Sequence, residues 1–353
     1  MNIPIEWPSM ERPIGAPERL WRRQRGWRAD TLSDDDWLLH LPPALIESLR
    51  VLATRALAGG IPAAGAIREW RPPYEALTFA ERIESLLEGG LGFCIVRGLP
   101  LLSPEAANEV ATLAFATLLG RPVSQSQQGN IVARVEDLGC DITKPGVRGH
   151  QTSAELAFHC DRADRVSLLC VRSAARGGQS KIVSSIQLKV DLSHKHPRLA
   201  ECLHAPLPQD RRGEQREYEP PWCMMPVFDT ADGLFVARYI RRFVEDSQRH
   251  HGAPRLSHET TLALDTLDAM MQEPGRALEM MLTPGDIQLL NNNVVLHART
   301  AFEDHRQPAR RRLLLRVWLS HKSARPLPAS FAALYGSTDA GTYRGGVWPH
   351  PDM

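Results

Sequence analysis

The stretch Phe158-His159-Cys160-Asp161 decides how the fold of this chain is predicted. In a β-strand successive side chains point to opposite faces, so His159 and Asp161 face one side while Phe158 and Cys160 face the other. A second imidazole, His297, ends the run Asn291-Asn292-Asn293-Val294-Val295-Leu296-His297, which follows the turn-forming Pro284-Gly285-Asp286. Two imidazoles and one carboxylate can form a facial triad that leaves one side of an octahedral metal open.

Taken alone, this pattern is weak. A His-x-Asp pair occurs by chance in many chains, and a buried histidine is more often a hydrogen-bonded core residue than a metal ligand. The rest of the sequence therefore has to support the metal interpretation.

Composition is that of an ordinary globular protein. The chain has 353 residues and 43% hydrophobic content, enough for one large domain or two smaller ones. It carries 42 Lys and Arg against 41 Asp and Glu, so its net charge of +1 gives no general attraction to nucleic acid or to an anionic membrane. The basic, aromatic stretch 19–28 is followed at once by Asp34-Asp35-Asp36, and we interpret it as a surface arm.

No apolar run is long enough to span a bilayer, and residues 1–10 lack the pattern of a secretory signal. We therefore expect a soluble, cytoplasmic protein with no nucleic-acid or membrane partner. Its six cysteines include no Cys-x-x-Cys pair, which is typical of reduced thiols rather than of a disulfide framework or a zinc knuckle.

The N-terminal third is predicted to be mostly helical after an irregular arm over residues 1–30. Proline starts and glycine ends predict the helices, and a short apolar run between glycines predicts a buried strand. The expected elements are helices at 44–52 and 79–88, a strand at 93–96, and a helix capped by Ser103 that runs to Leu119.

After Gly120 the pattern changes to short strands separated by turns, which is typical of a β-sandwich or barrel. Residues 210–225 are polar and lack periodicity, so we expect a long irregular loop that either closes over the site as a lid or is disordered. An amphipathic helix capped by Ser257 is predicted to run to Gln272. The other expected strands are 131–135, the segment leading into Asp161, 166–171 and 181–184.

The end of the chain carries a second functional signal. In a strand over 310–319, Arg312, Leu314, Arg316 and Trp318 share one face, and Leu313, Leu315, Val317 and Leu319 share the other. If this strand lies beside the His297 strand, two guanidinium groups point toward the metal. Such planar groups can hold a carboxylate with two parallel hydrogen bonds.

With these motifs the sequence resembles the TauD/TfdA-like (clavaminate synthase-like) Fe(II)/2-oxoglutarate-dependent dioxygenases. The resemblance covers residues 89–319 and is strongest in the motifs already quoted and in Gly177-Gly178-Gln179-Ser180. It implies an α+β fold with a double-stranded β-helix (jelly roll) core, a mostly helical N-terminal region and a helix inserted before the last strands. It also implies a single domain over 1–353, made of an arm with helices (1–88), the core with its inserted loop (89–322) and a tail (323–353).

The resemblance also assigns residues. His159, Asp161 and His297 match the iron ligands, Arg312 matches the arginine that binds the distal carboxylate of 2-oxoglutarate, and Ser180 matches a hydroxyl that assists it. Arg316 matches a position that contacts substrate or cosubstrate, and the roles of the two arginines can be exchanged. Because Asp161 is kept, hydroxylation rather than halogenation is implied.

The function implied is coupling of 2-oxoglutarate decarboxylation to succinate, with Fe(II) and O2, to C–H oxidation of a small polar metabolite of the amino-acid type. Desaturation, epimerisation or cyclisation would use the same motifs. Residues 210–225, Glu155, Asp164 and Arg165 are expected to line the substrate pocket, and a homo-oligomer is left open.

Two other classes fit part of the pattern. A zinc-dependent hydrolase can use two imidazoles and a carboxylate, but it gives the two arginines no role. A non-catalytic jelly-roll binding protein would leave both the triad and the anion-binding arginine unexplained.

Overall fold

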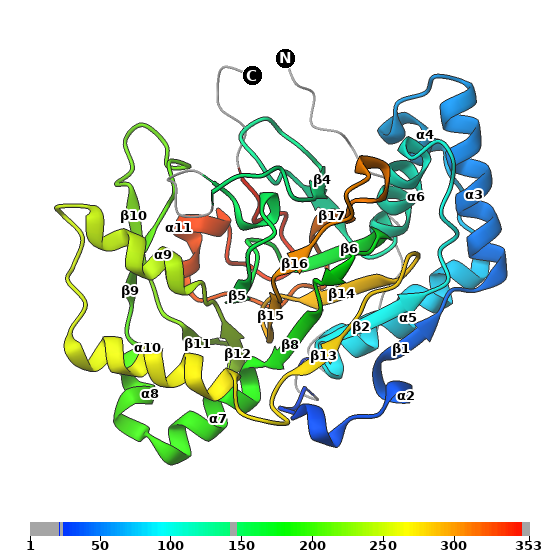
Figure 1. Cartoon of the computed structure of the whole chain (residues 1–353). Helices are drawn as coiled ribbons and strands as arrows, with labels where there is room; N and C mark the ends of the chain where they lie inside the picture. Colours follow the sequence, from blue (N-terminus) through cyan, green and yellow to red (C-terminus); the bar gives the residue numbers. More distant parts are fainter. Residues whose placement is uncertain (1–20, 22–23, 142–146, 348–353) are drawn as a thin grey trace.

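The computed structural model describes residues 21, 24–141 and 147–347. Two β-sheets face each other, and helices cover the outer side of each (Figure 1). Most of the arm predicted over 1–30 lies outside the described residues. Trp27, in the described part, is buried and donates its indole N–H to the Leu91 carbonyl at 2.8 Å, so this part packs on the body.

The large sheet has seven strands in the described part of the chain. Their order is β1-β2-β14-β6-β17-β3, and β4 also pairs with β17. Only β1 and β2 pair in parallel among the printed pairs of this sheet. The strands are β1 (Leu38–His40), β2 (Phe93–Arg97), β3 (Arg121–Val123), β4 (Val132–Val135), β6 (Arg165–Arg172), β14 (Ile287–Asn291) and β17 (Leu313–Ser320).

The small sheet has the strand order β13-β8-β15-β5, and three further pairs of strands form antiparallel two-stranded sheets. The small-sheet strands are β5 (Leu156–His159), β8 (Ser180–Ser184), β13 (Leu278–Met280) and β15 (Val295–Arg299). The pairs are β9 (Leu207–Asp210) with β10 (Trp222–Met225), β11 (Phe228–Ala231) with β12 (Leu234–Ala237), and β7 (Arg176–Gly177) with β16 (Phe302–Glu303).

Side chains alternate along the strands between the core that separates the two sheets and the faces that the helices cover, as the sequence predicts. In β17, Leu313, Leu315, Val317 and Leu319 pack under the N-terminal helices, whereas Leu314 and Trp318 face the core between the sheets. In β15, Val295 faces the inner core, and Leu296 and Ala298 pack under the second group of helices. His297 and Arg299 are thus on the inner side.

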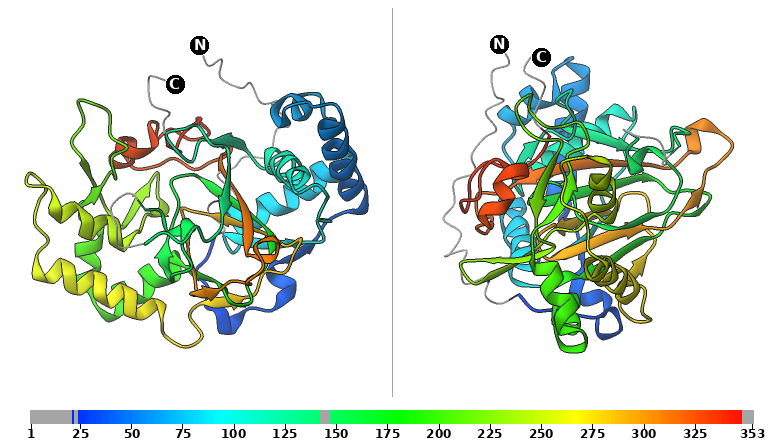
Figure 2. Two further views of the ribbon diagram at one scale, coloured as in Figure 1. Left: turned by 45° about the horizontal axis from the view of Figure 1, so that its top comes forward. Right: turned by 90° about the vertical axis from the view of Figure 1, so that its left-hand side faces the viewer.

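The helices form two groups on opposite sides of the sheets: the left view of Figure 2 shows them apart, and in the right view the second group lies in front of the first. The predicted proline start and glycine end of the first long helix are confirmed at Pro43 and Gly59, and the Ser257 hydroxyl caps α10 by accepting from the Thr260 N–H. The first group and the segment before it contain α2 (Asp34–Trp37), α3 (Pro43–Ala58), α4 (Ala63–Glu69), α5 (Tyr74–Gly89) and α6 (Ala106–Thr117). The second contains α7 (Ser185–Lys195), α8 (Pro197–His204), α9 (Arg241–Asp246) and α10 (His258–Met271).

Short elements complete the chain: the 3-10 turns η1 (Ala29–Thr31), η2 (Gly149–Gln151), η3 (Ser247–Arg249), η4 (Pro308–Arg310) and η5 (Ala329–Phe331), and helix α11 (Ala332–Tyr335). The predicted combination of helices and sheets is confirmed. No helix in the described residues is both long and apolar enough to cross a membrane.

Two local predictions are wrong. Ser103 does not cap a helix: α6 begins at Ala106, and the Asn108 side chain instead bonds both the N–H and the carbonyl of Leu102. Residues 210–225 are not a wholly irregular loop, because Asp210 pairs with Trp222 at the end of the β9–β10 hairpin. These strands could not be recognised from the polar sequence, because backbone hydrogen bonds between β9 and β10 hold them rather than a hydrophobic pattern.

Candidate active site

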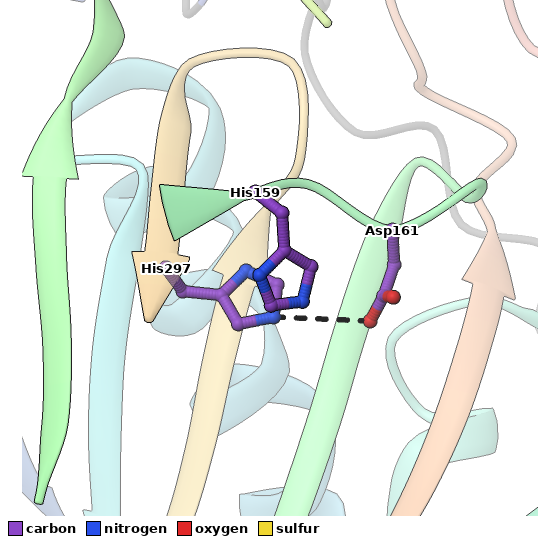
Figure 3. A group of neighbouring side chains, drawn as sticks. All are labelled: His159, Asp161 and His297. Atoms are coloured by element: carbon purple, nitrogen blue, oxygen red, sulfur yellow. Dashed lines mark ion pairs between the residues drawn. The ribbon is translucent and has the colours of Figure 1, made fainter. Parts of the chain in front are cut away.

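Three side chains that can bind a metal converge between the sheets (Figure 3). His159, at the end of β5, lies directly opposite His297 on β15, and their ring centroids are 4.2 Å apart. The His297 Nε2 is 3.9 Å from the Asp161 Oδ2. One potential ligand atom from each residue lies within 4.8 Å of the other two.

Asp161 lies just beyond the end of β5, and backbone contacts keep its segment extended. The Cys160 N–H donates to the Tyr239 carbonyl at 3.1 Å, and Phe158 and Cys160 face the outer core as predicted. The Asn292 side chain accepts from the Asp161 N–H at 3.1 Å and donates to the Ala163 carbonyl at 2.9 Å. Asn292, which the sequence analysis placed only in the run that leads to His297, therefore positions the carboxylate segment.

The protonation states suit a divalent metal. Nδ1 of His159 lies 2.8 Å from the Ala157 carbonyl, which can only accept, so Nδ1 carries the proton and Nε2 is left with a lone pair. Burial, together with the charge of His159, lowers the pKa of His297 to about 3. Burial alone would raise the pKa of Asp161, but Arg316 and then the two imidazoles outweigh it and hold this pKa at about 2. At neutral pH the group offers two neutral imidazoles and one carboxylate, a set that fits Fe(II).

Of the two predicted arginines, Arg316 reaches the triad, from the opposite sheet. The condition stated for them, that their strand lies beside the His297 strand, is not met, because β17 pairs with β6, β3 and β4 in the large sheet. Arg316 still points inward: its Nη1 is 3.3 Å from both carboxylate oxygens of Asp161, and its Nε donates to the Gln125 Oε1 at 2.7 Å.

Arg312 and Arg299 contact the same aromatic ring, and the sequence analysis did not identify Arg299. Arg312 and Arg299 approach the ring of Phe302, with Cζ atoms 5.0 Å and 4.7 Å from its centroid. Within the described residues, Nη1 of Arg312 and both Nε and Nη1 of Arg299 are buried without a hydrogen-bond partner. Burial and then the charge of Arg312 lower the pKa of Arg299 to about 9. Two-residue periodicity from His297 was the signal that could have identified Arg299.

Ser180 and the glycines before it adjoin this pair of arginines. Ser180 pairs with Arg299 in the β8–β15 register, and its hydroxyl exchanges hydrogen bonds with the Gln288 side chain. Gly178 has a φ of +75°, and a Cβ there would lie 3.2 Å from the Arg312 Nε. Glycine at this position therefore permits both the turn and the close approach of the guanidinium.

A cavity of about 300 Å³ opens beside the triad. It is lined by Glu155, as predicted, but neither Asp164 nor Arg165 lines it. Asp164 forms a buried ion pair with Arg344 at 2.8 Å, and Arg165 forms one with Glu84 at 2.6 Å. Both predictions are wrong because the extended alternation does not continue past Asp161, so these side chains turn into the protein core.

The cavity wall is rich in arginine. Arg211, Arg212 and Glu214 of the β9–β10 hairpin contribute to it, together with Arg148 and Arg162 on either side of β5. Burial, and after it the charges of Arg212 and Arg316, lower the pKa of Arg148 to about 10. Arg211 and Arg212 fall within residues 210–225, which were expected to line the pocket, and Arg316 was predicted to face it. The sequence analysis did not identify Arg148, Arg162 or Arg238.

Sequence comparisons identify relatives. The family model described as "Taurine catabolism dioxygenase TauD, TfdA family" matches residues 54–318. FR-33289 synthase of Streptomyces rubellomurinus (strain ATCC 31215) is 32% identical over 254 residues, covering 70% of this chain and 74% of the relative. Uridine-5'-phosphate dioxygenase of Amycolatopsis sp is 27% identical over 239 residues, covering 64% of this chain and 84% of the relative.

Solved structures share the fold. Asparagine oxygenase in complex with Fe(II), 2S,3S-3-hydroxyasparagine and succinate matches with a TM-score of 0.62 and 19% identity, covering 83% of this chain and 98% of that one. The non-heme iron oxygenase OrfP in complex with Fe and alpha-ketoglutaric acid matches with a TM-score of 0.59 and 16% identity, covering 86% of this chain and 100% of that one.

Proposed function

The chain belongs to the taurine catabolism dioxygenase TauD, TfdA family and is an Fe(II)/2-oxoglutarate-dependent dioxygenase, and from this premise we propose that it hydroxylates a small polar metabolite of the amino-acid type. Bound Fe(II), with O2, supplies the oxidation: 2-oxoglutarate loses CO2 to become succinate, and one oxygen atom enters a C–H bond of the substrate. The protein supplies the metal ligands, the cosubstrate contacts and a shaped cavity.

The single observation that carries the proposal is the convergence of His159, Asp161 and His297. We assign these three residues as the iron ligands. The assignment is supported by their neutral and ionised forms at neutral pH and by the cavity on one side of the group. Three protein ligands leave the remaining octahedral positions for cosubstrate and oxygen.

We assign Arg312 as the residue that binds the distal carboxylate of 2-oxoglutarate. Its buried Nη1 has no partner among the described residues, whereas Arg316 is already bonded to Asp161 and Gln125. A buried guanidinium is stable when an anion pairs with it. We also assign Arg299 as a second cation for this carboxylate, and Ser180 as a hydroxyl that donates to it in exchange for its bond to the Gln288 Oε1. Arg316 then orients Asp161 and contacts the substrate.

The finer fold assignment is also a proposal. We interpret the facing sheets as a double-stranded β-helix (jelly roll) in one domain over 1–353. Support comes from the inner core shared by the two sheets and from the buried ion pairs that attach the C-terminal segment, Arg325 with Glu88 and Arg344 with Asp164.

The proposed substrate type rests on what similar proteins bind. The OrfP structures include complexes with (3S)-hydroxy-L-Arg, and the asparagine oxygenase structure contains hydroxyasparagine. The cavity of about 300 Å³ admits a molecule of that size.

The test is direct. Protein supplied with Fe(II), 2-oxoglutarate and O2 should release succinate when offered substrate, and a mass-spectrometric screen of metabolites should find a product heavier by one oxygen atom. A product lighter by two hydrogen atoms would show that the reaction is desaturation and not hydroxylation. Absence of any iron- and 2-oxoglutarate-dependent succinate would contradict the proposed function.

We also propose that the β9–β10 hairpin covers the bound substrate. Arg211, Arg212 and Glu214 already line the cavity from this hairpin. Limited proteolysis should therefore cut the exposed segment around Arg216 and Tyr218 more slowly when iron, cosubstrate and substrate are all bound. Equal cutting rates with and without them would contradict a covering role.

A further inference from the structure

The cavity beside the triad contains more cationic than anionic side chains. Among the described residues that line it there are eight arginines and four carboxylates. Two of these carboxylates have other partners: Asp161 belongs to the triad, and Asp210 pairs with Arg249 at 2.7 Å and with His250 at 3.1 Å. Five of the arginines are also paired with carboxylates: Arg211, Arg212, Arg241, Arg242 and Arg316. Arg148, Arg162 and Arg238 then remain against Glu155 and Glu214. The charge available to a molecule in the cavity is therefore positive, and it favours an anion.

One carboxylate lies between two arginines of the cavity wall. Arg148 Nη2 contacts Glu214 Oε1, and Arg162 Nη1 is 3.4 Å from Glu214 Oε2, with the Glu214 side chain only 9% exposed. The arginines come from segments on either side of β5, whereas Glu214 comes from the turn of the β9–β10 hairpin. The Glu214 carboxylate thus occupies a position where the guanidinium groups of Arg148 and Arg162 can both bind an oxyanion.

A third arginine of the wall has no carboxylate contact among the described residues. Arg238 is 1% exposed, and its Nη1 lies 3.4 Å from both the Asp161 carbonyl and the Tyr335 hydroxyl. Its Nε is buried with no hydrogen-bond partner in the described chain. The partners of Arg238 in the described chain are thus uncharged groups, the Tyr335 ring among them, so no carboxylate neutralises this buried cation. A negative charge that enters the cavity would be attracted to it.

We propose that Arg148 and Arg162, with Arg238, bind a doubly charged tetrahedral oxyanion of the substrate, a phosphonate or a phosphate monoester, which takes the place of the Glu214 carboxylate. This inference rests on the proposed function, since it names the charged group of the molecule to be hydroxylated. A single negative charge would only replace that of Glu214. A second charge also compensates Arg238, and three oxygen atoms accept from guanidinium groups that approach from different directions.

The experiment is calorimetric titration of protein loaded with Fe(II) and saturating 2-oxoglutarate under anaerobic conditions. The probes are methylphosphonate, methyl phosphate, methanesulfonate and acetate, at a pH where the first two are doubly ionised. We expect the doubly charged probes to bind at least about tenfold more tightly than the singly charged ones, and the tighter of the two identifies the source of the oxyanion.

Variants assign the binding to this wall. Arg148→Met and Arg162→Met should each weaken methylphosphonate binding by at least about tenfold while the affinity for 2-oxoglutarate is unchanged. Arg134→Met is the control, because Arg134 lies on β4 and pairs with Glu105, Glu109 and Glu136 away from the cavity. Glu214→Gln should tighten methylphosphonate binding, since it preserves the shape of the side chain and removes the competing charge.

Equal binding of all four probes, or unchanged binding in both arginine variants, would overturn the site. Weaker binding in Glu214→Gln would overturn the exchange with Glu214. The 2-oxoglutarate titration separates this proposal from the proposed function. If 2-oxoglutarate does not bind but methylphosphonate binding still depends on Arg148, the assignment of the reaction fails and the anion site stands.

Discussion

His159→Ala and His297→Ala are each expected to abolish Fe(II) binding and all 2-oxoglutarate-dependent release of succinate, with the fold retained. Removing a mere hydrogen-bond partner of a metal ligand costs about 10–100-fold in affinity, so removing the ligand itself should cost more. The two imidazoles lie directly opposite each other across β5 and β15, so neither can substitute for the other. Metal content, anaerobic Fe(II) titration and circular dichroism measure the outcome.

Cys160→Ser is the matched control for these variants. Cys160 lies between His159 and Asp161 but faces the outer core, where its sulfur approaches the Tyr239 carbonyl. We expect iron binding and turnover to persist in this variant. Full turnover in either histidine variant would refute the triad, and loss of iron in Cys160→Ser would refute the assigned side-chain directions.

Arg312→Ala is expected to raise the 2-oxoglutarate concentration needed for turnover steeply while Fe(II) binding is preserved. A buried, hydrogen-bonded guanidinium–carboxylate pair that loses one partner costs about 2–5 kcal/mol, because the remaining charge is left without compensation. Arg312→Lys should restore only part of the affinity, since it returns the charge without the planar pair of donors. Titration with 2-oxoglutarate in the absence of O2 measures the loss directly.

Two neighbouring arginines serve as comparisons. Arg299→Met should weaken 2-oxoglutarate binding less than Arg312→Ala, because Arg299 also holds the Thr152 carbonyl at 2.9 Å and is only partly directed to the cosubstrate. Arg316→Ala should leave 2-oxoglutarate consumption but lower the amount of product formed per succinate. If Arg316→Ala instead loses 2-oxoglutarate binding and Arg312→Ala keeps it, the two roles are exchanged.

Local periodicity predicted the parts of the structure that depend on neighbouring residues. It gave the two faces of β17 and the shared side of His159 and Asp161, because side chains of a strand alternate whatever the strand pairs with. It failed for Ser103, because α6 begins only at Ala106 and the Asn108 side chain instead ties this helix to the backbone of Leu102. Capping depends on such contacts as well as on residue type.

Long-range pairing was the part that the sequence could not provide. Nothing in residues 313–320 distinguishes a partner in the sheet of β6 from one in the sheet of β15, so pairing with the His297 strand could be stated only as a condition. That condition is not met, but Arg316 still points inward. The cavity arginines had no local pattern, since Arg148, Arg162 and Arg238 meet only through the tertiary fold. The metal-ligand and cosubstrate roles of the candidate residues stay predictions until the variants are measured.

The Asn292 side chain has a consequence for how this enzyme can be re-engineered. The turn between β14 and β15 both leads into the strand of His297 and, through Asn292, fixes the segment of Asp161. An insertion or deletion there would shift two corners of the site together, whereas the part of the β9–β10 hairpin around Arg216 and Tyr218 is exposed and is not among the residues that line the cavity. The length of the β14–β15 turn is therefore constrained. Inserted or exchanged sequences should be tolerated better at the exposed end of the β9–β10 hairpin.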